Sequence, residues 1–469
     1  MLFNSFEFIF VFLPLVVGVY FFLTGKRLLL AAKTWLAAAS LFFYAWWNLS
    51  YVAILLGSIF FNFAVGNALV KQEKMRVKLP RVRVLQLGLA ANIALLAYFK
   101  YTDFFLTGVN EALGTQYPLL HLVLPLGISF FTITQITFLV DCYDGLVEET
   151  DFLNYLLFVT FFPHLLMGPI LHHKQILPQL ERLRNAVFQP DNLMRGLALF
   201  SMGLAKKILL ADQFALWAKQ GFGSIGALAT ADAWAVSLAY TLQLYFDFSG
   251  YTDMALGIAL LFNVRLPLNF NTPFKARSVI DFWQRWHMSL TRFITTYIYS
   301  AILKSFRRIT FQASMIATFL ALLTAGFWHD AKWGYLLFYF CHALALVINH
   351  WWKRKKLLKI PAVISWLLTF LFFNCTLLLF RAADLQDAGL MASKMLGINA
   401  AAAVGTLGGD WQTWAALSFG LLLAVRGLNS QELMERLRPN WLSACLIAAL
   451  LVLSCLRLNQ VSEFLYFNF

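Results

Sequence analysis

The sequence predicts an all-α polytopic membrane protein, a bundle of about 11–13 transmembrane helices with re-entrant and interfacial helices. Of the 469 residues, 60% are hydrophobic and 13% are charged, whereas about a quarter of the residues in a typical soluble domain are charged. Apolar runs of roughly 20 residues, the length that spans a bilayer, recur along nearly the whole chain. The alternating segments of about ten residues that mark a transmembrane barrel are not found in the sequence. We therefore expect one membrane domain over residues 1–469.

The first three apolar runs predict transmembrane helices at residues 5–24, 28–47 and 51–70. The following loop, residues 71–83, carries six basic residues and one acidic residue. Short loops rich in Lys and Arg stay in the cytoplasm, so this loop places the N-terminus outside and the turn at Lys26 and Arg27 inside. Glu7 near the start of the first run, with no small-residue cleavage pattern after it, indicates a retained helix instead of a removed signal peptide.

The next part of the chain predicts a helix at 84–98, an external segment up to residue 121, and a helix in LPLGISFFTITQITFLVDCYDG. Ser, Thr, Gln and Gly in that stretch favour packing against protein over packing against lipid. The chain then interrupts its helical pattern at four positions, Pro163, Gly168, Pro169 and Pro178. We expect a broken or re-entrant segment here, followed by a short amphipathic helix in the interface.

Two adjacent basic residues, Lys206 and Lys207, interrupt the apolar run at 193–217. Long basic side chains near a helix end commonly extend to the membrane surface, which is one interpretation of the pair. The other interpretation is a contact to the phosphate of a carrier that brings an acyl group. Both interpretations stay open at this point.

The C-terminal third predicts helices at residues 334–352, 361–380, 411–425 and 441–455. The basic stretch WWKRKKLLK marks a cytoplasmic turn, and Arg426, Arg436 and Arg438 mark another. Tracing outward from these turns places the turn that holds His329 in the outer half of the membrane and the final segment NQVSEFLYFNF outside. The single domain is expected to comprise N-terminal helices, a catalytic core, C-terminal helices and an aromatic tail, at residues 1–120, 121–352, 353–456 and 457–469.

Ionisable residues concentrate between positions 245 and 329, among aromatic and aliphatic residues typical of a bilayer-embedded segment. Charged and titratable side chains are costly in that environment and are commonly functional. They form the candidate site, which consists of Asp247, Asp253, Asp281, Arg285, His287 and His329.

Two histidines of this stretch share a setting, because His287 and His329 each follow a Trp at the end of an apolar run. In a water-poor cavity an imidazole can act as general base on a hydroxyl that attacks an acyl group. The alternative for each is a hydrogen-bonded structural histidine. The other histidines do not repeat this setting and favour structural roles; they are His121, His164, His172, His173, His342 and His350.

The carboxylates Asp247 and Asp253 allow two interpretations. They can form the ion pathway of a transporter, or they can hold the fold by pairing with Arg265, Arg285 or Arg292. Against a transporter, no internal repeat relates the two halves of the sequence. The net charge of +14 lies in short clusters that the positive-inside rule and anionic lipids explain, so nucleic-acid binding is not expected.

Signals of other enzyme classes are missing from the sequence. It has no nucleophile elbow, no phosphate-binding P-loop, no HExxH and no GxGxxG. The five cysteines lie singly in apolar surroundings without CxxC spacing. This pattern predicts buried, reduced thiols and no metal site.

Several long stretches of the chain, in order, are similar to a known family: MLFNSFEFIFVFLPL, LPLGISFFTITQITFLVD, FFPHLLMGPILHHKQILPQL, GLAKKILLAD, YFDFSGYTDMALG, NFNTPFKARSVIDFWQRWHMSLTRF and GFWHDAKWG. They resemble the membrane-bound O-acyltransferases (MBOAT), in the bacterial branch that includes the alginate and peptidoglycan O-acetylation proteins and the teichoic acid D-alanylation protein. The resemblance implies an MBOAT-like bundle around a central cavity in the bacterial cytoplasmic membrane. It also implies that His329 is catalytic and that His287 is the second site histidine. Two residues depart from the family pattern, Asp330 where Gly is frequent and His164 where Gln is typical.

The terminal FLYFNF resembles the short aromatic ending found in these systems. The resemblance implies that Tyr466 carries the acyl group between the membrane protein and an extracytoplasmic transferase. A phenol deprotonated by a nearby base is a competent nucleophile for this step. The alternative is an aromatic anchor at the membrane interface.

The expected enzyme is an acyltransferase that moves acetyl from a cytoplasmic thioester, either acetyl-CoA or an acyl carrier protein, to an acceptor outside. We expect no permanently bound cofactor, contacts with membrane lipids, and an SGNH-type or similar transferase that completes transfer to peptidoglycan, alginate or a similar polysaccharide. D-alanyl transfer to teichoic acid is the alternative within the family. The donor-binding candidates are Lys206, Lys207 and Arg285, and both termini are expected outside.

Overall fold

The computed structural model describes residues 1–71, 79–147, 150–330, 332–398, 410–436, 440–458 and 464–465. These residues form helices and connecting loops, with no β-strand among them, which confirms the predicted all-α class. The chain divides into two compact units. The first comprises Met1–Phe200 and Met254–Pro267, and the second comprises Ser201–Asp253 and Leu268–Phe469.

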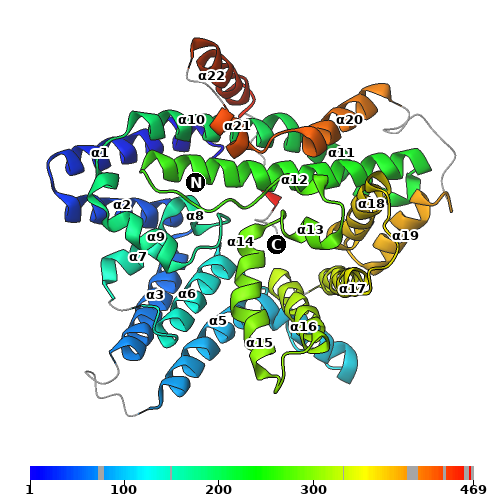
Figure 1. Cartoon of the computed structure of the whole chain (residues 1–469), viewed down its shortest axis with the longest axis horizontal. Coiled ribbons are helices and arrows are strands. Elements are labelled where there is room, and N and C mark those ends of the chain that lie inside the picture. The colour runs from blue at the N-terminus through cyan, green and yellow to red at the C-terminus, as the bar shows by residue number, and fades with distance from the viewer. Residues whose placement is uncertain are drawn as a thin grey trace. The chain divides into compact units, whose positions relative to one another are not determined.

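The first unit contains the N-terminal helices, drawn from blue to green-cyan in Figure 1. They are η1 (Glu7–Phe12), α1 (Leu13–Gly25), α2 (Leu29–Ala45), α3 (Leu49–Val70), α5 (Arg81–Leu113), α6 (Ile128–Tyr143), α7 (Phe152–Thr160), α8 (Phe162–Leu165), α9 (His173–Glu181), η2 (Leu183–Ala186) and most of α10 (Pro190–Ala205). The three helices predicted at the start of the chain are confirmed to within a few residues. The broken segment is also confirmed, since only the four-residue α8 forms before α9 begins.

Two sequence-based expectations for this unit are wrong. The helix expected to end at residue 98 continues through Lys100 and Asp103 as the 33-residue α5. Neither residue interrupts helical backbone hydrogen bonds, whereas Gly114 has a φ of +64° and provides the left-handed residue that ends the helix. Pro178 was expected to break the pattern, but it lies inside α9.

The predicted packing of α6 against protein is confirmed, because residues along most of its length are buried. Two glycines allow neighbouring helices to approach it closely. A Cβ atom at Gly66 of α3 would lie 2.5 Å from the ring of Phe138, and one at Gly88 of α5 would lie 2.7 Å from the side chain of Leu139. Small residues commonly permit such close helix crossings in membrane proteins.

The second unit contains the rest of the helices, which run from green to red in Figure 1. They are η3 (Lys206–Ala211), α11 (Asp212–Phe222), η4 (Ile225–Ala227), most of α12 (Thr230–Leu261), η5 (Pro273–Lys275), α13 (Val279–Trp283), α14 (Met288–Phe293), η6 (Ile294–Tyr299), α15 (Ser300–Ser305), α16 (Phe311–His329), α17 (Trp333–Lys355), α18 (Ala362–Arg381), α19 (Leu385–Met395), α20 (Trp411–Arg426), α21 (Ser430–Arg436) and α22 (Trp441–Cys455). The four helices predicted in the C-terminal third correspond to α17, α18, α20 and α22, and α19 was not predicted.

The polytopic membrane architecture is confirmed by helices long and apolar enough to cross a bilayer. Among the described residues there are six, at Glu7–Gly25, Leu49–Val70, Arg81–Leu113, Phe311–His329, Trp333–Lys355 and Ala362–Arg381. Three shorter apolar helices, at Leu29–Ala45, Ile128–Tyr143 and Trp441–Cys455, accompany them. The larger number of about 11–13 spanning helices stays a prediction.

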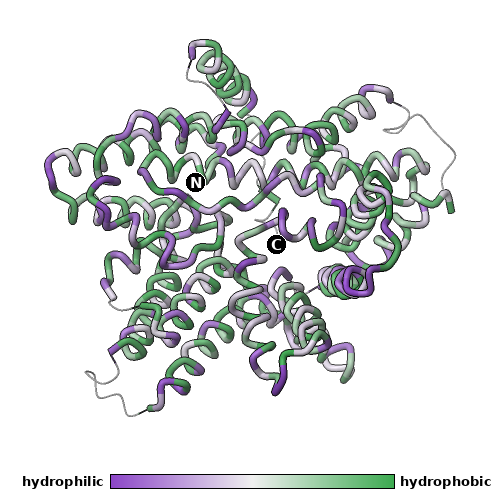
Figure 2. Tube along the Cα trace, in the orientation of Figure 1, coloured by the Kyte–Doolittle hydropathy of each residue, from purple (hydrophilic) through white to green (hydrophobic). Residues whose placement is uncertain are grey.

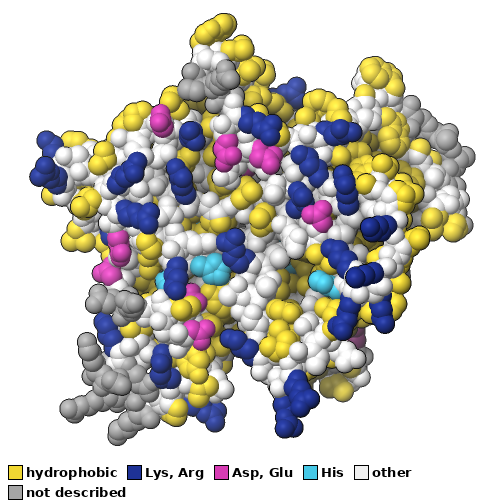
Figure 3. All heavy atoms as spheres, in the orientation of Figure 1, with side chains coloured by type: hydrophobic (Ala, Val, Ile, Leu, Met, Phe, Trp, Pro, Cys, Tyr) yellow, Lys and Arg dark blue, Asp and Glu magenta, His cyan; other side chains and the backbone are white. Residues whose placement is uncertain are grey.

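Figure 2 shows apolar stretches along most helices, and the last turn of α17 is strongly hydrophilic because it contains Lys353, Arg354 and Lys355. On the face seen in Figure 3, Lys and Arg side chains stand among exposed hydrophobic ones. The five cysteines are unbridged, but Cys375 and Cys445 are exposed on helix surfaces, so the expected burial is wrong for these two.

Candidate active site

His329 is the last residue of α16, and the turn predicted to hold it begins one residue later. Its side chain is buried, with 4% of the residue exposed. The imidazole ring stacks on the ring of Tyr339, with centroids 5.3 Å apart and an interplanar angle of 20°. Trp328 and Phe380 face it edge-on, with centroids at 4.7 and 6.0 Å. An aromatic wall therefore surrounds the predicted catalytic residue.

The sequence of α16 explains how His329 reaches this position. The helix buries one face at every fourth residue, and that face is built from small side chains up to the histidine: Ala313, Ala317, Ala321, Ala325, Gly326 and His329. Such a stripe lets two membrane helices approach closely. A Cβ atom at Gly326 would lie 2.9 Å from the Cβ atom of Tyr339 on α17. Close packing of α16 on α17 therefore holds Tyr339 against the imidazole.

His287 lies between α13 and α14 in a left-handed backbone conformation, with φ 44° and ψ 53°. Residues other than Gly seldom adopt this conformation, which costs about 1–3 kcal/mol and clusters at functional sites. The residue is 1% exposed, and its ring lies edge-on to Phe248 with centroids 4.8 Å apart. His287 is outside the candidate membrane spans, and its burial lowers its pKa to about 3. The imidazole is therefore neutral near pH 7.

Asn269 fixes the orientation of His287. Its Oδ1 accepts hydrogen bonds from the backbone N–H and the hydroxyl of Ser289, at 3.1 and 2.9 Å. The same oxygen lies 3.2 Å from Nδ1 of His287. An amide oxygen can only accept, so Nδ1 carries the proton and Nε2 carries the lone pair. Nε2 is buried and has no hydrogen-bond partner in the described part of the chain, so it can accept a hydrogen bond from a ligand.

Aromatic contacts link the segments that hold the two histidines. Trp283, four residues before His287, packs against Tyr339 with ring centroids 5.8 Å apart, and Tyr339 stacks on His329. The indole N–H of Trp283 donates to Nδ1 of His342 at 3.2 Å. The structure therefore brings the RWH and FWH motifs, 42 positions apart in the sequence, to one aromatic cluster in the second unit.

The predicted carboxylates have partners, but these are not the arginines suggested by the sequence. Asp247 pairs with Lys207 at 2.7 Å, and Asp253 pairs with Lys206 at 2.6 Å. Lys207 also pairs with Asp212 at 2.9 Å. Arg265, Arg285 and Arg292 are therefore wrong as the partners of Asp247 and Asp253, which pair with two lysines. The interpretation of the lysines as side chains extending to the membrane surface is wrong for Lys207, which is 2% exposed.

The spacing of α12 explains these pairs, because Asp247, Gly250 and Asp253 lie three residues apart and share a helix face. A Cβ atom at Gly250 would lie 2.8 Å from the backbone oxygen of Gly203 and 3.2 Å from the backbone nitrogen of Lys207. The glycine therefore lets the backbone that carries the lysines come against α12. Without that approach the lysines would not meet the carboxylates on either side of it.

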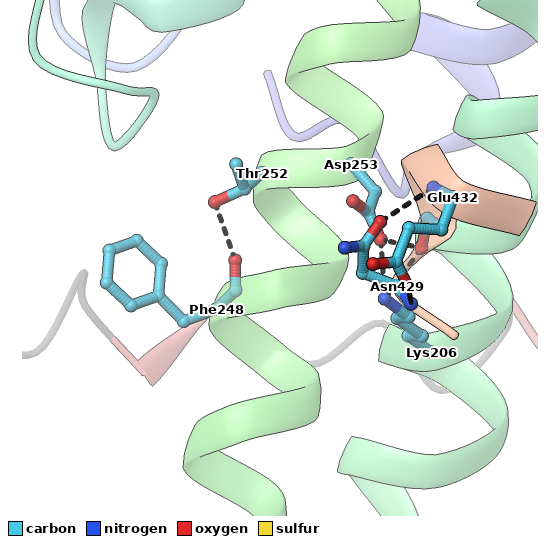
Figure 4. Close-up of polar contacts among 7 residues, drawn as sticks. Lys206, Phe248, Thr252, Asp253, Asn429 and Glu432 are labelled. Atoms are coloured by element: carbon cyan, nitrogen blue, oxygen red, sulfur yellow. Dashed lines mark hydrogen bonds and ion pairs between the residues drawn. The ribbon is translucent and has the colours of Figure 1, made fainter. Parts of the chain in front are cut away.

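The two sides of α12 contact different neighbours, as Figure 4 shows. Phe248 and Thr252 lie on one side, and Phe248 contacts His287. Asp253 and Lys206 lie on the other side, near Asn429 and Glu432 of the segment that begins α21. There the hydroxyl of Ser430 donates to Oδ2 of Asp253 at 2.5 Å. These contacts hold α12 in place behind the histidine site.

Arg285 and Asp281 form an ion pair one helical turn apart, with Nε and Oδ1 at 2.7 Å. Arg285 also donates to the backbone oxygen of Asn271 at 3.3 Å. About a third of each side chain in the pair is exposed, 31% for the arginine and 34% for the aspartate. Arg285 therefore keeps surface that a ligand can contact.

Three of the histidines predicted to be structural, His164, His173 and His342, have hydrogen-bond partners. His164 contacts the backbone oxygen of Phe158 at 2.9 Å, and His173 contacts Asp141 at 2.7 Å. His342 accepts from Trp283 and contacts the hydroxyl of Thr376 at 3.0 Å, which occupies both ring nitrogens. No group of three His, Cys, Asp or Glu side chains among the described residues could hold a metal ion.

Asn269 and Tyr339 belong to the site but were not predicted from the sequence. Asn269 carried a detectable signal, because it is an amide within the otherwise apolar run LPLNF. Tyr339 carried none, since an aromatic residue inside an apolar helix commonly packs in a core. Tyr466, the predicted acyl carrier, lies outside the described residues.

Comparison with known proteins identifies the family. Residues 19–381 match the sequence model of the membrane-bound O-acyltransferase family. A peptidoglycan O-acetyltransferase of Helicobacter pylori is 37% identical, over 100% of this chain and 98% of that relative. A probable alginate O-acetylase of Pseudomonas aeruginosa is 36% identical over 85% of this chain and 75% of its own length. A teichoic acid D-alanyltransferase of Streptococcus thermophilus is 29% identical over 49% of this chain and 58% of its own length. The chain belongs to the membrane-bound O-acyltransferase family, and it is an acyltransferase.

Proposed function

We propose that the chain passes an acetyl group from a cytoplasmic thioester, acetyl-CoA or an acyl carrier protein, to an acceptor outside the membrane. The product is an O-acetylated polysaccharide of the cell envelope. The observation that carries the proposal is the convergence of two buried histidine motifs on one aromatic cluster through Trp283 and Tyr339. Peptidoglycan is the first candidate polymer, because the relative named for it matches this chain over its whole length. Alginate is the second.

In the proposed mechanism His329 is the general base. A ring nitrogen takes the proton of the acceptor hydroxyl while the hydroxyl oxygen attacks the thioester carbonyl carbon. A C–O bond forms, the C–S bond breaks, and the imidazolium returns the proton to the leaving thiolate. The aromatic wall around His329 excludes water, which prevents hydrolysis of the thioester at this point.

His287 has a separate role in this proposal. Its neutral ring presents the Nε2 lone pair, so it accepts a hydrogen bond from a donor or acceptor group and orients that group. It does not supply a positive charge, because burial lowers its pKa to about 3. Of the three basic residues considered for donor binding, Arg285 is favoured, since Lys206 and Lys207 are engaged by buried carboxylates.

The acceptor hydroxyl in the proposal is the phenol of Tyr466. The tyrosine becomes a phenyl ester and passes its acetyl group to an extracytoplasmic transferase of the SGNH type, which completes transfer to the polysaccharide. The reaction would place the chain in the cytoplasmic membrane of a bacterium, with both termini outside.

The test uses membranes that contain the full chain and radiolabelled acetyl-CoA. His329→Ala is expected to reduce acetyl transfer at least about 100-fold, the scale of lost general base catalysis. His350→Ala provides the matched control. His350 lies half-buried near the C-terminal end of α17, away from Tyr339, so this variant should retain full activity. Normal transfer by His329→Ala at equal protein level would refute the assigned base.

A second candidate, D-alanyl transfer, is favoured by the similarity of half of this chain to a teichoic acid D-alanyltransferase. The two functions differ in the donor. Supplying the same membranes with a D-alanyl carrier protein or with acetyl-CoA distinguishes them. Incorporation of D-alanine and not of acetate would replace the first proposal with the second.

A further inference from the structure

The last described residues of the chain contact α12 in the second unit. Phe464 is fully buried, and its ring lies edge-on to Tyr251 with centroids 4.9 Å apart and an interplanar angle of 83°. Nζ of Lys207 lies 4.7 Å from the centroid of the same ring. The backbone N–H of Leu465 donates to Oδ2 of Asp247 at 3.0 Å. The segment is thus held by an aromatic contact, a cation–π contact and a hydrogen bond to a carboxylate.

The carboxylate of Asp247 divides its two oxygens between two partners. Oδ1 pairs with Lys207 at 2.7 Å, and Oδ2 accepts from Leu465. Both ionic side chains are 2% exposed, so each requires the other to remain charged. Hydrogen bonds to a charged acceptor are stronger than those between neutral groups, which makes this carboxylate an effective holder of a backbone N–H.

We propose that Asp247, fixed by Lys207, is a positioning residue that anchors the segment beginning at Phe464. This inference rests on the proposed function, in which Tyr466 carries the acyl group. Leu465 directly precedes Tyr466 in the sequence, and consecutive Cα atoms lie about 3.8 Å apart, so the anchored residue is the direct neighbour of the proposed acyl carrier. Confining a nucleophile raises its effective concentration at the reacting atoms. In this proposal the buried carboxylate of Asp247 holds the segment in addition to pairing with Lys207.

The anchor requires a side chain at position 247 that accepts hydrogen bonds at two oxygens. Lys207 and Leu465 bind different oxygens of Asp247. An Asn side chain in the same position has an oxygen at only one of these places and an NH₂ group at the other, so it can accept there from Lys207 or from Leu465 but not from both. The ammonium of Lys207 strongly favours the oxygen, which turns the NH₂ group toward the N–H of Leu465. Asp247→Asn is therefore expected to release the segment while Lys207 keeps Asp212 as its partner.

Hydrogen–deuterium exchange of the purified full chain in detergent tests this, with the Leu465 amide as reporter. In the natural chain this amide is expected to exchange slowly because it is hydrogen-bonded to Asp247, and Asp247→Asn is expected to accelerate its exchange at least about 10-fold. Asp212→Asn is the matched control, because it removes the other carboxylate from Lys207 and keeps Asp247, the acceptor of the Leu465 N–H. Unchanged exchange in Asp247→Asn, or equal acceleration in the control, would overturn the anchor.

Leu465→Pro supplies a second variant, since proline has no backbone N–H and leaves the buried ion pairs intact. It is expected to accelerate exchange at the neighbouring amides of the segment and to reduce acetyl transfer at least about 10-fold. If Leu465→Pro keeps both the slow exchange of the neighbouring amides and full acetyl transfer, the anchor is also overturned. Tyr466→Phe separates the acyl relay from the anchor. It is expected to abolish acetyl transfer and to leave the Leu465 amide protected from exchange. Normal transfer by Tyr466→Phe refutes the acyl relay, and the anchor is then judged by exchange alone.

Discussion

At the scale of single residues, the site depends on groups that fix the histidines as much as on the histidines. Oδ1 of Asn269 receives two hydrogen bonds from Ser289 and lies beside Nδ1 of His287. It thereby selects the tautomer and holds the turn in its left-handed conformation. Nδ2 of the same amide has no hydrogen-bond partner among the described residues. The oxygen of Asn269 is therefore the atom of this side chain that holds His287 and Ser289.

This arrangement predicts the effects of two substitutions. Asn269→Ala leaves buried donors without their acceptor, each costing about 1–3 kcal/mol, so thermal stability should fall. It should also reduce kcat about 10-fold or more, because His287 loses its fixed tautomer. Asn269→Asp keeps an acceptor oxygen at the same place and should restore part of kcat. The measurement is steady-state acetyl transfer together with thermal unfolding, and wild-type kcat in Asn269→Ala would contradict this role.

At the scale of elements, the helix pair α16 and α17 positions the base. Small residues on α16 let α17 approach until Tyr339 stacks on His329. A larger residue at position 326 would require the helices to shift, because its Cβ atom would lie 2.9 Å from the Cβ atom of Tyr339. The geometry of the catalytic group is thus set by the packing of two helices more than by the short connection between them.

Gly326→Ala tests this packing. Its Cβ atom would lie 2.9 Å from Tyr339, which requires the helices to shift, and overpacking of this kind costs about 1–3 kcal/mol. We expect a lower unfolding temperature and reduced acetyl transfer. Gly18→Ala in α1 is the control, because nothing lies within 4 Å of its added Cβ atom. That substitution should be neutral or stabilise by about 0.5–1 kcal/mol. Equal effects of the two changes on unfolding would argue against the packing role.

At the scale of the whole molecule, the remaining question is orientation in the membrane. The basic loop before α5 is expected inside, and α5 crosses once, so Gly114 should lie outside. The basic end of α17 is also expected inside, which places His329 toward the outer half. This orientation would bring the predicted base to the side of the membrane where the acceptor is proposed to lie.

Reporter fusions check this orientation. Alkaline phosphatase inserted after Gly114 should be active, and the same reporter inserted after Lys356 should be inactive. Green fluorescent protein, which folds in the cytoplasm, should give the opposite result at both sites. Phosphatase activity at Lys356 would reverse the orientation and move His329 to the cytoplasmic half.

Much of the fold was predictable, because a transmembrane helix is a local property of about 20 apolar residues. The predicted runs became helices with small errors at their ends. The clear failure is α5, where Lys100 and Asp103 predict an exit from the membrane but the helix continues to Leu113, with Gly114 as its left-handed C-cap. Charge is a weak signal for the end of a helix, whereas a left-handed glycine is a strong one.

The sequence by itself determined the membrane class, the order of the helices and the family, and it selected His287 and His329 from eight histidines. Only the tertiary structure decided which groups meet. It replaced arginine partners of Asp247 and Asp253 with two lysines, and it added Asn269 to the site. The length of an apolar run and the presence of a motif are local properties of the sequence, so they can be recognised without a structure. A hydrogen bond or ion pair depends on distances through space, which close packing at residues such as Gly250 and Gly326 sets.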